Sequence, residues 1–188
     1  MARANEPRTI ARSLLVLGGA RSGKSAYAQR LAEAHGPERL YLATAARGDE
    51  EMAARIARHQ ADRGHGWRTL EEPLEIATAL LTHAQAGRVV VVDCLTLWLS
   101  NLMLAGHDPG PALTALADAM NRLTGPAILV SNEVGMGIVP DHKLGREFRD
   151  WQGRANREIG AACDGVIFIA AGLPLQLKPA ATPSVQLG

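Results

Sequence analysis

Residues 18–25 read Gly18-Gly19-Ala20-Arg21-Ser22-Gly23-Lys24-Ser25, which matches the phosphate-loop pattern of Gly, four residues, Gly, Lys and then Ser or Thr. Apolar residues 14–17 predict a buried strand before this loop, and residues 26–33 predict a helix after it. Glycines let successive backbone N–H groups converge on one anion, and the helix N-terminus adds partial positive charge there. We therefore expect Lys24 to reach the β- and γ-phosphates of a nucleotide and the Ser25 hydroxyl to hold Mg²⁺. The alternative is a Gly-rich turn that binds nothing, which the flanking strand and helix disfavour.

The rest of the chain alternates between apolar runs and stretches with helical periodicity. We expect strands at residues 14–17, 40–43, 67–70, 89–93, 127–131 and 165–170, and helices at 26–33, 49–61, 74–83, 94–104, 112–123 and 143–162. Residues 89–92 are four valines in a row, which is typical of a parallel strand covered on both faces. The pattern predicts a three-layer α/β fold with a mainly parallel sheet. We expect one domain over residues 1–188, with flexible ends at 1–8 and 179–188.

Composition limits the function classes. Hydrophobic residues make up 47% of the 188, which argues against overall disorder. The net charge is +1 without a charge block, so neither a nucleic-acid tract nor a membrane-surface patch is indicated. No apolar run reaches the roughly 18 residues that a bilayer span needs, and the charged residues 1–12 are not followed by an apolar segment long enough to predict a signal peptide. Cys94 and Cys163 lack metal-ligand spacing, so a reduced, cytoplasmic setting fits best.

One edge of the predicted sheet gathers the candidate residues, because ligands of such folds bind outside the carboxyl ends of the strands. Residues 18–25, Thr44, Asp93 and the loop from Ser131 to Pro140 follow such ends. In phosphate-loop enzymes an Asp at the end of a buried strand supports the Mg²⁺ held by the loop Ser, although Asp93 could instead cap the next helix. The apolar, Gly-containing loop could face a substrate or form a packed turn.

Other polar residues carry weaker signals. His59 lies one turn after Arg55, near Arg63, so it could attack a phosphorus atom, although a His near a helix C-terminus is commonly there for the helix dipole. Glu71 could contact a nucleotide hydroxyl or be solvated. The helix at 143–162 carries Arg146, Arg149, Arg154 and Arg157, which could bind anionic groups or form a solvated face. The chain lacks an Asn-Lys-x-Asp element, which argues against a guanine-specific signalling switch.

Taken together, residues 15–177 resemble the bifunctional adenosylcobinamide kinase / adenosylcobinamide-phosphate guanylyltransferase family of cobalamin biosynthesis. Besides the phosphate loop, the resemblance rests on Tyr41-Leu42-Ala43-Thr44-Ala45, Asp49-Glu50-Glu51-Met52-Ala53-Ala54-Arg55-Ile56, Trp67-Arg68-Thr69-Leu70-Glu71, Val92-Asp93-Cys94-Leu95-Thr96, Ser131-Asn132-Glu133-Val134-Gly135-Met136-Gly137-Ile138-Val139-Pro140 and Gly153-Arg154-Ala155-Asn156. The later stretches are more specific than the phosphate loop, which many families share.

The resemblance implies two reactions on one site. Members phosphorylate adenosylcobinamide with ATP or GTP, and then transfer GMP from GTP to the phosphate through a GMP-histidine intermediate, giving adenosylcobinamide-GDP and pyrophosphate. His59 matches that histidine. The implied guanine-nucleotide contacts are Leu17, Gly18, Gly19, Ala20, Arg21, Ser22, Gly23, Lys24, Ser25, Ala43, Thr44, Ala45, Gln60, Ala61, Asp62, Arg63, Glu71 and Asp93. It also implies a RecA-like domain, assembled as homotrimers, with Ser25 and Asp93 on Mg²⁺.

Two other functions remain open at this point. A kinase with a single reaction would need no histidine nucleophile. A RecA-like regulatory or assembly module would bind a nucleotide without a small-molecule acceptor, and stimulation by single-stranded DNA would favour it, although the near-neutral charge argues against it.

Overall fold

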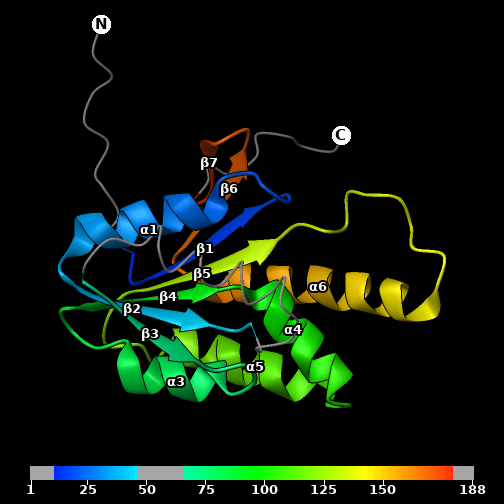
Figure 1. The fold of residues 1–188 in the computed structure, drawn as a ribbon, viewed down its shortest axis with the longest axis horizontal. Coiled ribbons are helices and arrows are strands. Elements are labelled where there is room, and N and C mark those ends of the chain that lie inside the picture. Colours follow the sequence, from blue (N-terminus) through cyan, green and yellow to red (C-terminus); the bar gives the residue numbers. More distant parts are fainter. Residues whose placement is uncertain (1–10, 46–65, 180–188) are drawn as a thin grey trace, which may run out of the picture.

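The computed structural model describes residues 11–45 and 66–179, which form a seven-stranded sheet with helices on both faces (Figure 1). The strand order is β3-β2-β4-β5-β1-β6-β7. The strands are β1 (Ser13–Gly18), β2 (Glu38–Ala43), β3 (Trp67–Glu71), β4 (Arg88–Asp93), β5 (Ala127–Asn132), β6 (Gly165–Ala170) and β7 (Leu173–Lys178). Every pairing is parallel except that of β6 with β7. The predicted three-layer, mainly parallel α/β fold is confirmed.

Two apolar clusters separate the layers. On one face, α1 (Lys24–His35) buries Ala28 and Ala32 against the sheet. The other face is covered by α3 (Ile76–His83), α4 (Leu95–Leu104), α5 (Pro109–Met120) and α6 (Lys143–Ala162). Figure 1 shows α1 above the sheet and α3, α5 and α6 below it. Because the strands are apolar on both faces, as the valines of β4 illustrate, the sheet needs both helical layers.

Most element predictions agree with the structure, and two do not. The helix predicted at 112–123 is α5, which begins three residues earlier at Pro109. The Asp108 side chain accepts a hydrogen bond from Gly110 N, and proline suits the first helical position, so these residues start the helix. The helix predicted at 49–61 lies outside the described residues.

The second difference is β7, because β6 is not the last strand. Ala170 pairs with Leu173, which leaves only Ala171 and Gly172 in the turn. Both have positive φ, 51° and 79°, the conformation of a two-residue hairpin with a type I′ turn. Residues 173–178 were not predicted as a strand. Pro174 lies within β7, which is consistent with an edge strand, where proline is tolerated.

The carboxyl ends of five strands meet at one edge of the sheet. Ala43 of β2 pairs with Glu71 of β3 on one side and with Asp93 of β4 on the other. Gly18 of β1 pairs with Asn132 of β5. The parallel register therefore places the phosphate loop and the residues predicted beside it along this edge, as expected.

Candidate active site

The phosphate loop links β1 to α1 in a tight turn. Arg21 and Gly23 have positive φ, 56° and 96°, and Ser22 N donates to Gly19 O at 3.3 Å. At Gly18 a side chain has no room, because a Cβ would lie 2.5 Å from Ser22 Oγ and 2.7 Å from Ile169 O. The turn therefore depends on glycine at this position.

Lys24 is the first residue of α1, and its ammonium group lies over the loop. Its side chain is buried, and Nζ donates to Gly19 O at 3.0 Å. A charged phosphate oxygen is a stronger acceptor than a neutral carbonyl. The Lys24 ammonium group can therefore exchange this carbonyl for a phosphate without leaving the loop.

Asp93 ends β4, and its carboxylate is oriented by a neighbouring strand. The Tyr41 hydroxyl of β2 donates to Asp93 Oδ2 at 2.9 Å. Tyr41 is buried, and a buried tyrosine hydroxyl needs a partner. The helix-cap alternative for Asp93 is wrong, because the N-cap of α4 is Cys94, without a side-chain cap bond. Asp93 is therefore held at the strand end by Tyr41.

The ends of β2 and β4 are joined next to this carboxylate. Thr44 Oγ1 accepts from Cys94 N and donates to Cys94 O, both at 2.8 Å, and Asn101 Nδ2 donates to Thr44 O at 2.7 Å. Burial raises the pKa of the Cys94 thiol to about 11, the Asp93 charge adds to this, and the Lys24 charge opposes it. Lys24 and Asp93 thus both lie within electrostatic reach of one thiol.

The end of β5 is anchored by a buried polar network on α6. Ser131 Oγ donates to Asn156 Oδ1 at 2.7 Å, and Gln152 Nε2 donates to the same two oxygens at 2.9 and 3.0 Å. Asn156 Nδ2 donates to Asn132 O at 3.0 Å, while Asn132 N donates to Thr96 Oγ1 of α4 at 3.0 Å. Gln152 Oε1 is buried without a hydrogen-bond partner. This network fixes the strand end that pairs with the phosphate loop.

Sequence analysis assigned no role to Tyr41, Gln152 or Asn156, although Tyr41 and Asn156 lie in stretches that carry the family resemblance. A tyrosine inside an apolar parallel strand was one available signal. The other was the spacing of Gln152 and Asn156, four residues apart on the face that buries Ala155 and Ile159. Polar residues on the buried face of a helix require partners.

Some of the remaining predicted positions lie in or beside the strands, and others lie outside the described residues. Leu17 and Ala43 are buried in strands, Ala45 follows β2, and Glu71 is exposed at the end of β3 beside Ala43. The nucleophile candidate His59 and residues 60–63 (Gln60, Ala61, Asp62 and Arg63) lie outside the described residues. Their roles therefore stay predictions.

Three of the four predicted arginines of α6 make contacts close to their own helix, and the fourth, Arg157, is exposed. Arg149 pairs with Asp150 and Arg154 with Glu158, at 2.9 and 2.6 Å. Arg146 Nη1 donates to the carbonyls of Pro140 and Asp141, at 3.0 and 2.7 Å. Arg149 and Arg154 therefore agree with the prediction of a solvated helix face, while Arg146 holds the loop before α6.

The oxygen donors suit a magnesium ion shared with a nucleotide. Ser25 in the first turn of α1 and Asp93 at the end of β4 come from elements that pack against each other. Among residues 11–45 and 66–179, no group of three or more His, Cys, Asp or Glu could hold a metal by itself. Mg²⁺ usually takes its other ligands from phosphates and water, so two protein donors fit this ion.

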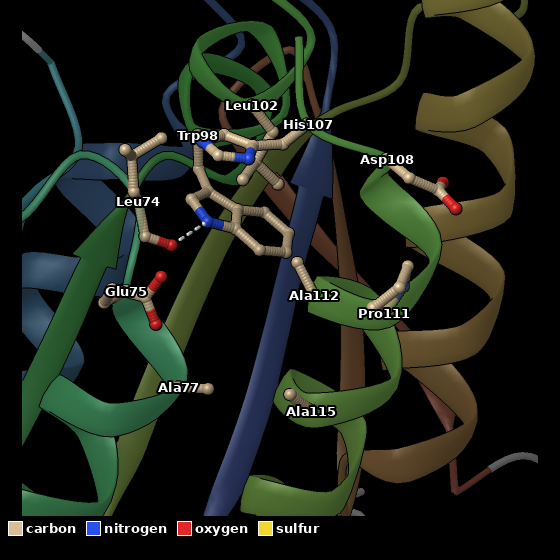
Figure 2. A pocket seen from close by; sticks show the side chains of 10 residues that line it. All are labelled: Leu74, Glu75, Ala77, Trp98, Leu102, His107, Asp108, Pro111, Ala112 and Ala115. Atoms are coloured by element: carbon tan, nitrogen blue, oxygen red, sulfur yellow. Dashed lines mark hydrogen bonds between the residues drawn. The ribbon is translucent and has the colours of Figure 1, made fainter. Parts of the chain in front are cut away.

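A cavity of about 280 Å³ lies away from the phosphate loop, between α3, α4 and α5 (Figure 2). Trp98 lines it, and its indole Nε1 donates to Leu74 O at 2.7 Å. None of the predicted nucleotide contacts lines this cavity, so we do not assign it to the nucleotide. No helix in the described part of the chain is long and apolar enough to cross a bilayer.

Comparison with known proteins identifies the family. The chain is 50% identical over 167 residues to the bifunctional adenosylcobalamin biosynthesis protein CobP of Pseudomonas aeruginosa, covering 87% of this chain and 96% of that protein. It is 37% identical over 180 residues to the bifunctional adenosylcobalamin biosynthesis protein CobU of Salmonella typhimurium, covering 88% of this chain and 99% of that protein.

The fold recurs in the flagellar accessory protein FlaH from Methanocaldococcus jannaschii, with a TM-score of 0.50 at 13% identity, covering 84% of this chain and 70% of FlaH. Residues 14–177 match the family model described as cobinamide kinase / cobinamide phosphate guanyltransferase. The chain therefore belongs to the cobinamide kinase / cobinamide phosphate guanyltransferase family.

Proposed function

We propose that this enzyme phosphorylates adenosylcobinamide with ATP or GTP, and then transfers GMP from GTP to the new phosphate through a GMP adduct of His59. The observation that supports this best is the position of the Lys24 ammonium group over the phosphate loop. This loop lies at the same edge of the sheet as Asp93, which Tyr41 orients. Such an edge suits a triphosphate with its magnesium ion. Family membership supplies the acceptor, cobinamide.

In the kinase reaction, the substrate hydroxyl attacks the γ-phosphorus while the bond from that phosphorus to the bridging oxygen breaks. Lys24 and the loop amides stabilise the charge on the phosphate oxygens. Ser25 and Asp93 would hold Mg²⁺, which supplies further charge neutralisation when bound.

In the guanylyl reaction, an imidazole nitrogen of His59 attacks the α-phosphorus of GTP and pyrophosphate leaves. The same loop stabilises the departing pyrophosphate. An oxygen of the corrinoid phosphate then attacks the GMP phosphorus, and the bond to His59 breaks. One phosphate-binding loop thus serves both reactions, with different attacking groups.

The test is His59→Ala, with Lys24→Ala as the matched comparison. We expect His59→Ala to keep cobinamide phosphorylation and to lose both GMP transfer and labelling by GTP radioactive at the α-phosphate. Lys24→Ala should impair both reactions. Loss of both in a folded His59→Ala protein would contradict this division of roles, and a GMP adduct that persists in it would exclude His59 as the nucleophile.

We further propose that the enzyme assembles as a homotrimer. Support comes only from the family resemblance described above. Light scattering after size-exclusion chromatography tests this: a mass three times the 20.0 kDa of one chain is expected, and a monomer would contradict it.

A further inference from the structure

The loop between β5 and α6 presents large apolar side chains to solvent. Met136, Ile138 and Val139 are 79, 98 and 60% exposed, so the packed-turn alternative for this loop is wrong. Leu104 at the end of α4 and Leu144 at the start of α6 are 75 and 52% exposed. We call these five residues the apolar platform. Where large exposed apolar side chains lie together, they mark surfaces that bind something.

A cavity of about 230 Å³ opens beside the platform, between the end of α4 and the first turns of α6. Its apolar lining comes from Met103, Leu104, Leu144 and Phe148, with Ser100 and His142 as polar members. Sites that enclose a whole drug-sized ligand have volumes of about 300–1,000 Å³. This cavity therefore suits one edge of a larger molecule.

Three of the platform residues belong to a loop that begins beside the phosphate loop. This loop leaves β5 at Asn132, the register partner of Gly18, and Glu133 N donates to Gly18 O at 3.1 Å. At the other end, Arg146 holds the carbonyls of Pro140 and Asp141. Figure 1 shows this loop and the start of α6 beyond the carboxyl edge of the sheet, with the end of α4 below them. A molecule on the platform would thus lie at the same edge as a bound nucleotide.

We infer that the apolar platform and its cavity bind the corrinoid ring of cobinamide, so that the arm carrying the reacting hydroxyl extends toward the phosphate loop. This inference rests on the proposed function. Cobinamide is a large, nearly flat macrocycle with methyl groups on its faces and amide arms around it. Its faces match the platform, and the Ser100 hydroxyl and His142 imidazole offer hydrogen bonds to an amide arm at the cavity.

Two variants remove platform contacts without touching the phosphate loop: Ile138→Ser and Leu144→Ser. Both residues are largely exposed, so folding should be preserved. The matched control is Leu175→Ser on β7, where the leucine is 59% exposed on another part of the surface. Steady-state kinase assays give KM separately for cobinamide and for GTP. Equilibrium dialysis with cobinamide alone gives Kd, and light scattering gives the subunit number.

We expect each platform variant to raise the KM and Kd for cobinamide about tenfold, the affinity that one well-buried large side chain supplies, while the KM for GTP stays within about twofold. Leu175→Ser should resemble the unmodified enzyme. An unchanged cobinamide KM in both platform variants would overturn the inference. A changed subunit number with loss of both activities would also overturn it, since the platform would then be a subunit interface. If the unmodified enzyme binds GTP yet never phosphorylates cobinamide, the proposed function itself fails.

Discussion

Removal of the Tyr41 hydroxyl tests whether the structure has identified what orients Asp93. In Tyr41→Phe the ring stays in the core, where it contacts Trp67 edge-on at 6.3 Å, and the 2.9 Å hydrogen bond to Asp93 Oδ2 is lost. A hydrogen bond to a charged group contributes about 1.5–3 kcal/mol. Asp93 is only partly buried, so water can replace part of this bond, and we expect a loss of about 1–2 kcal/mol in the free energy of unfolding.

Thermal unfolding and magnesium titration measure the two consequences of Tyr41→Phe. For a chain of this size, about 1 kcal/mol corresponds to roughly 2–4 °C in Tm, so Tm should fall by about 2–8 °C. If the same amount, about 1–2 kcal/mol, is lost from metal binding, the Mg²⁺ concentration for half-maximal kinase activity should rise by about five- to thirtyfold, because about 1.4 kcal/mol is a factor of ten.

The control is Tyr27→Phe on α1, where the other tyrosine of the chain has the Arg30 guanidinium 5.9 Å from its ring. That change keeps the ring and should leave the Mg²⁺ dependence unaltered. If Tyr41→Phe has the Tm and Mg²⁺ dependence of the unmodified enzyme, Tyr41 does not orient Asp93 for the metal, and the reasoning is refuted.

Three further predictions follow from local geometry. Gly18→Ala should weaken GTP binding at least tenfold in calorimetry, because the added methyl group would lie 2.5 Å from Ser22 Oγ. Gly19→Ala has open space at its Cβ and should bind GTP nearly normally. Equal GTP affinities of the two variants would contradict the prediction. Gln152→Glu should lower the free energy of unfolding by about 2–4 kcal/mol, measured with urea, because a buried carboxylate would face oxygen acceptors. Gln152→Leu should lower it less. A larger loss in Gln152→Leu than in Gln152→Glu would show that the network is not buried as described. Burial raises the pKa of the Cys94 thiol to about 11, against an ordinary 9.0, so the folded protein holds the thiol proton at pH values where the unfolded chain has lost it. The stability that Cys94 contributes is therefore complete below pH 9 and is lost as the pH rises toward 11. Urea unfolding between pH 8 and 11 should show a smaller alkaline loss in Cys94→Ala, and identical slopes would exclude the effect.

The sequence was sufficient for the features that depend on one pattern. The phosphate loop, the strand of four valines and the helix at 143–162 follow from glycine spacing and periodicity, and the structure confirms all three. The edge strand β7 could not be predicted so readily, because its hairpin depends on a positive φ at Ala171, a residue with no intrinsic preference for it.

The site was predicted from the sequence less completely than the fold. Asp93 was expected at a strand end, yet the orientation of its carboxylate comes from Tyr41, 52 residues away in the chain. The bonds of Gln152 to Ser131 likewise join α6 to β5. Such partners depend on strand order, which local sequence patterns do not specify. The role of His59 stays a prediction that the family resemblance supports.

In the proposed function, one loop offers a triphosphate to two attacking groups, first the corrinoid hydroxyl and then His59. The most direct measurement is mass spectrometry of the corrinoid after incubation of the enzyme with cobinamide, GTP and Mg²⁺. We expect cobinamide phosphate to appear first and a product carrying GMP on that phosphate to replace it. Cobinamide that remains unmodified, or that stops at the phosphate while GTP is in excess, would contradict the proposed function.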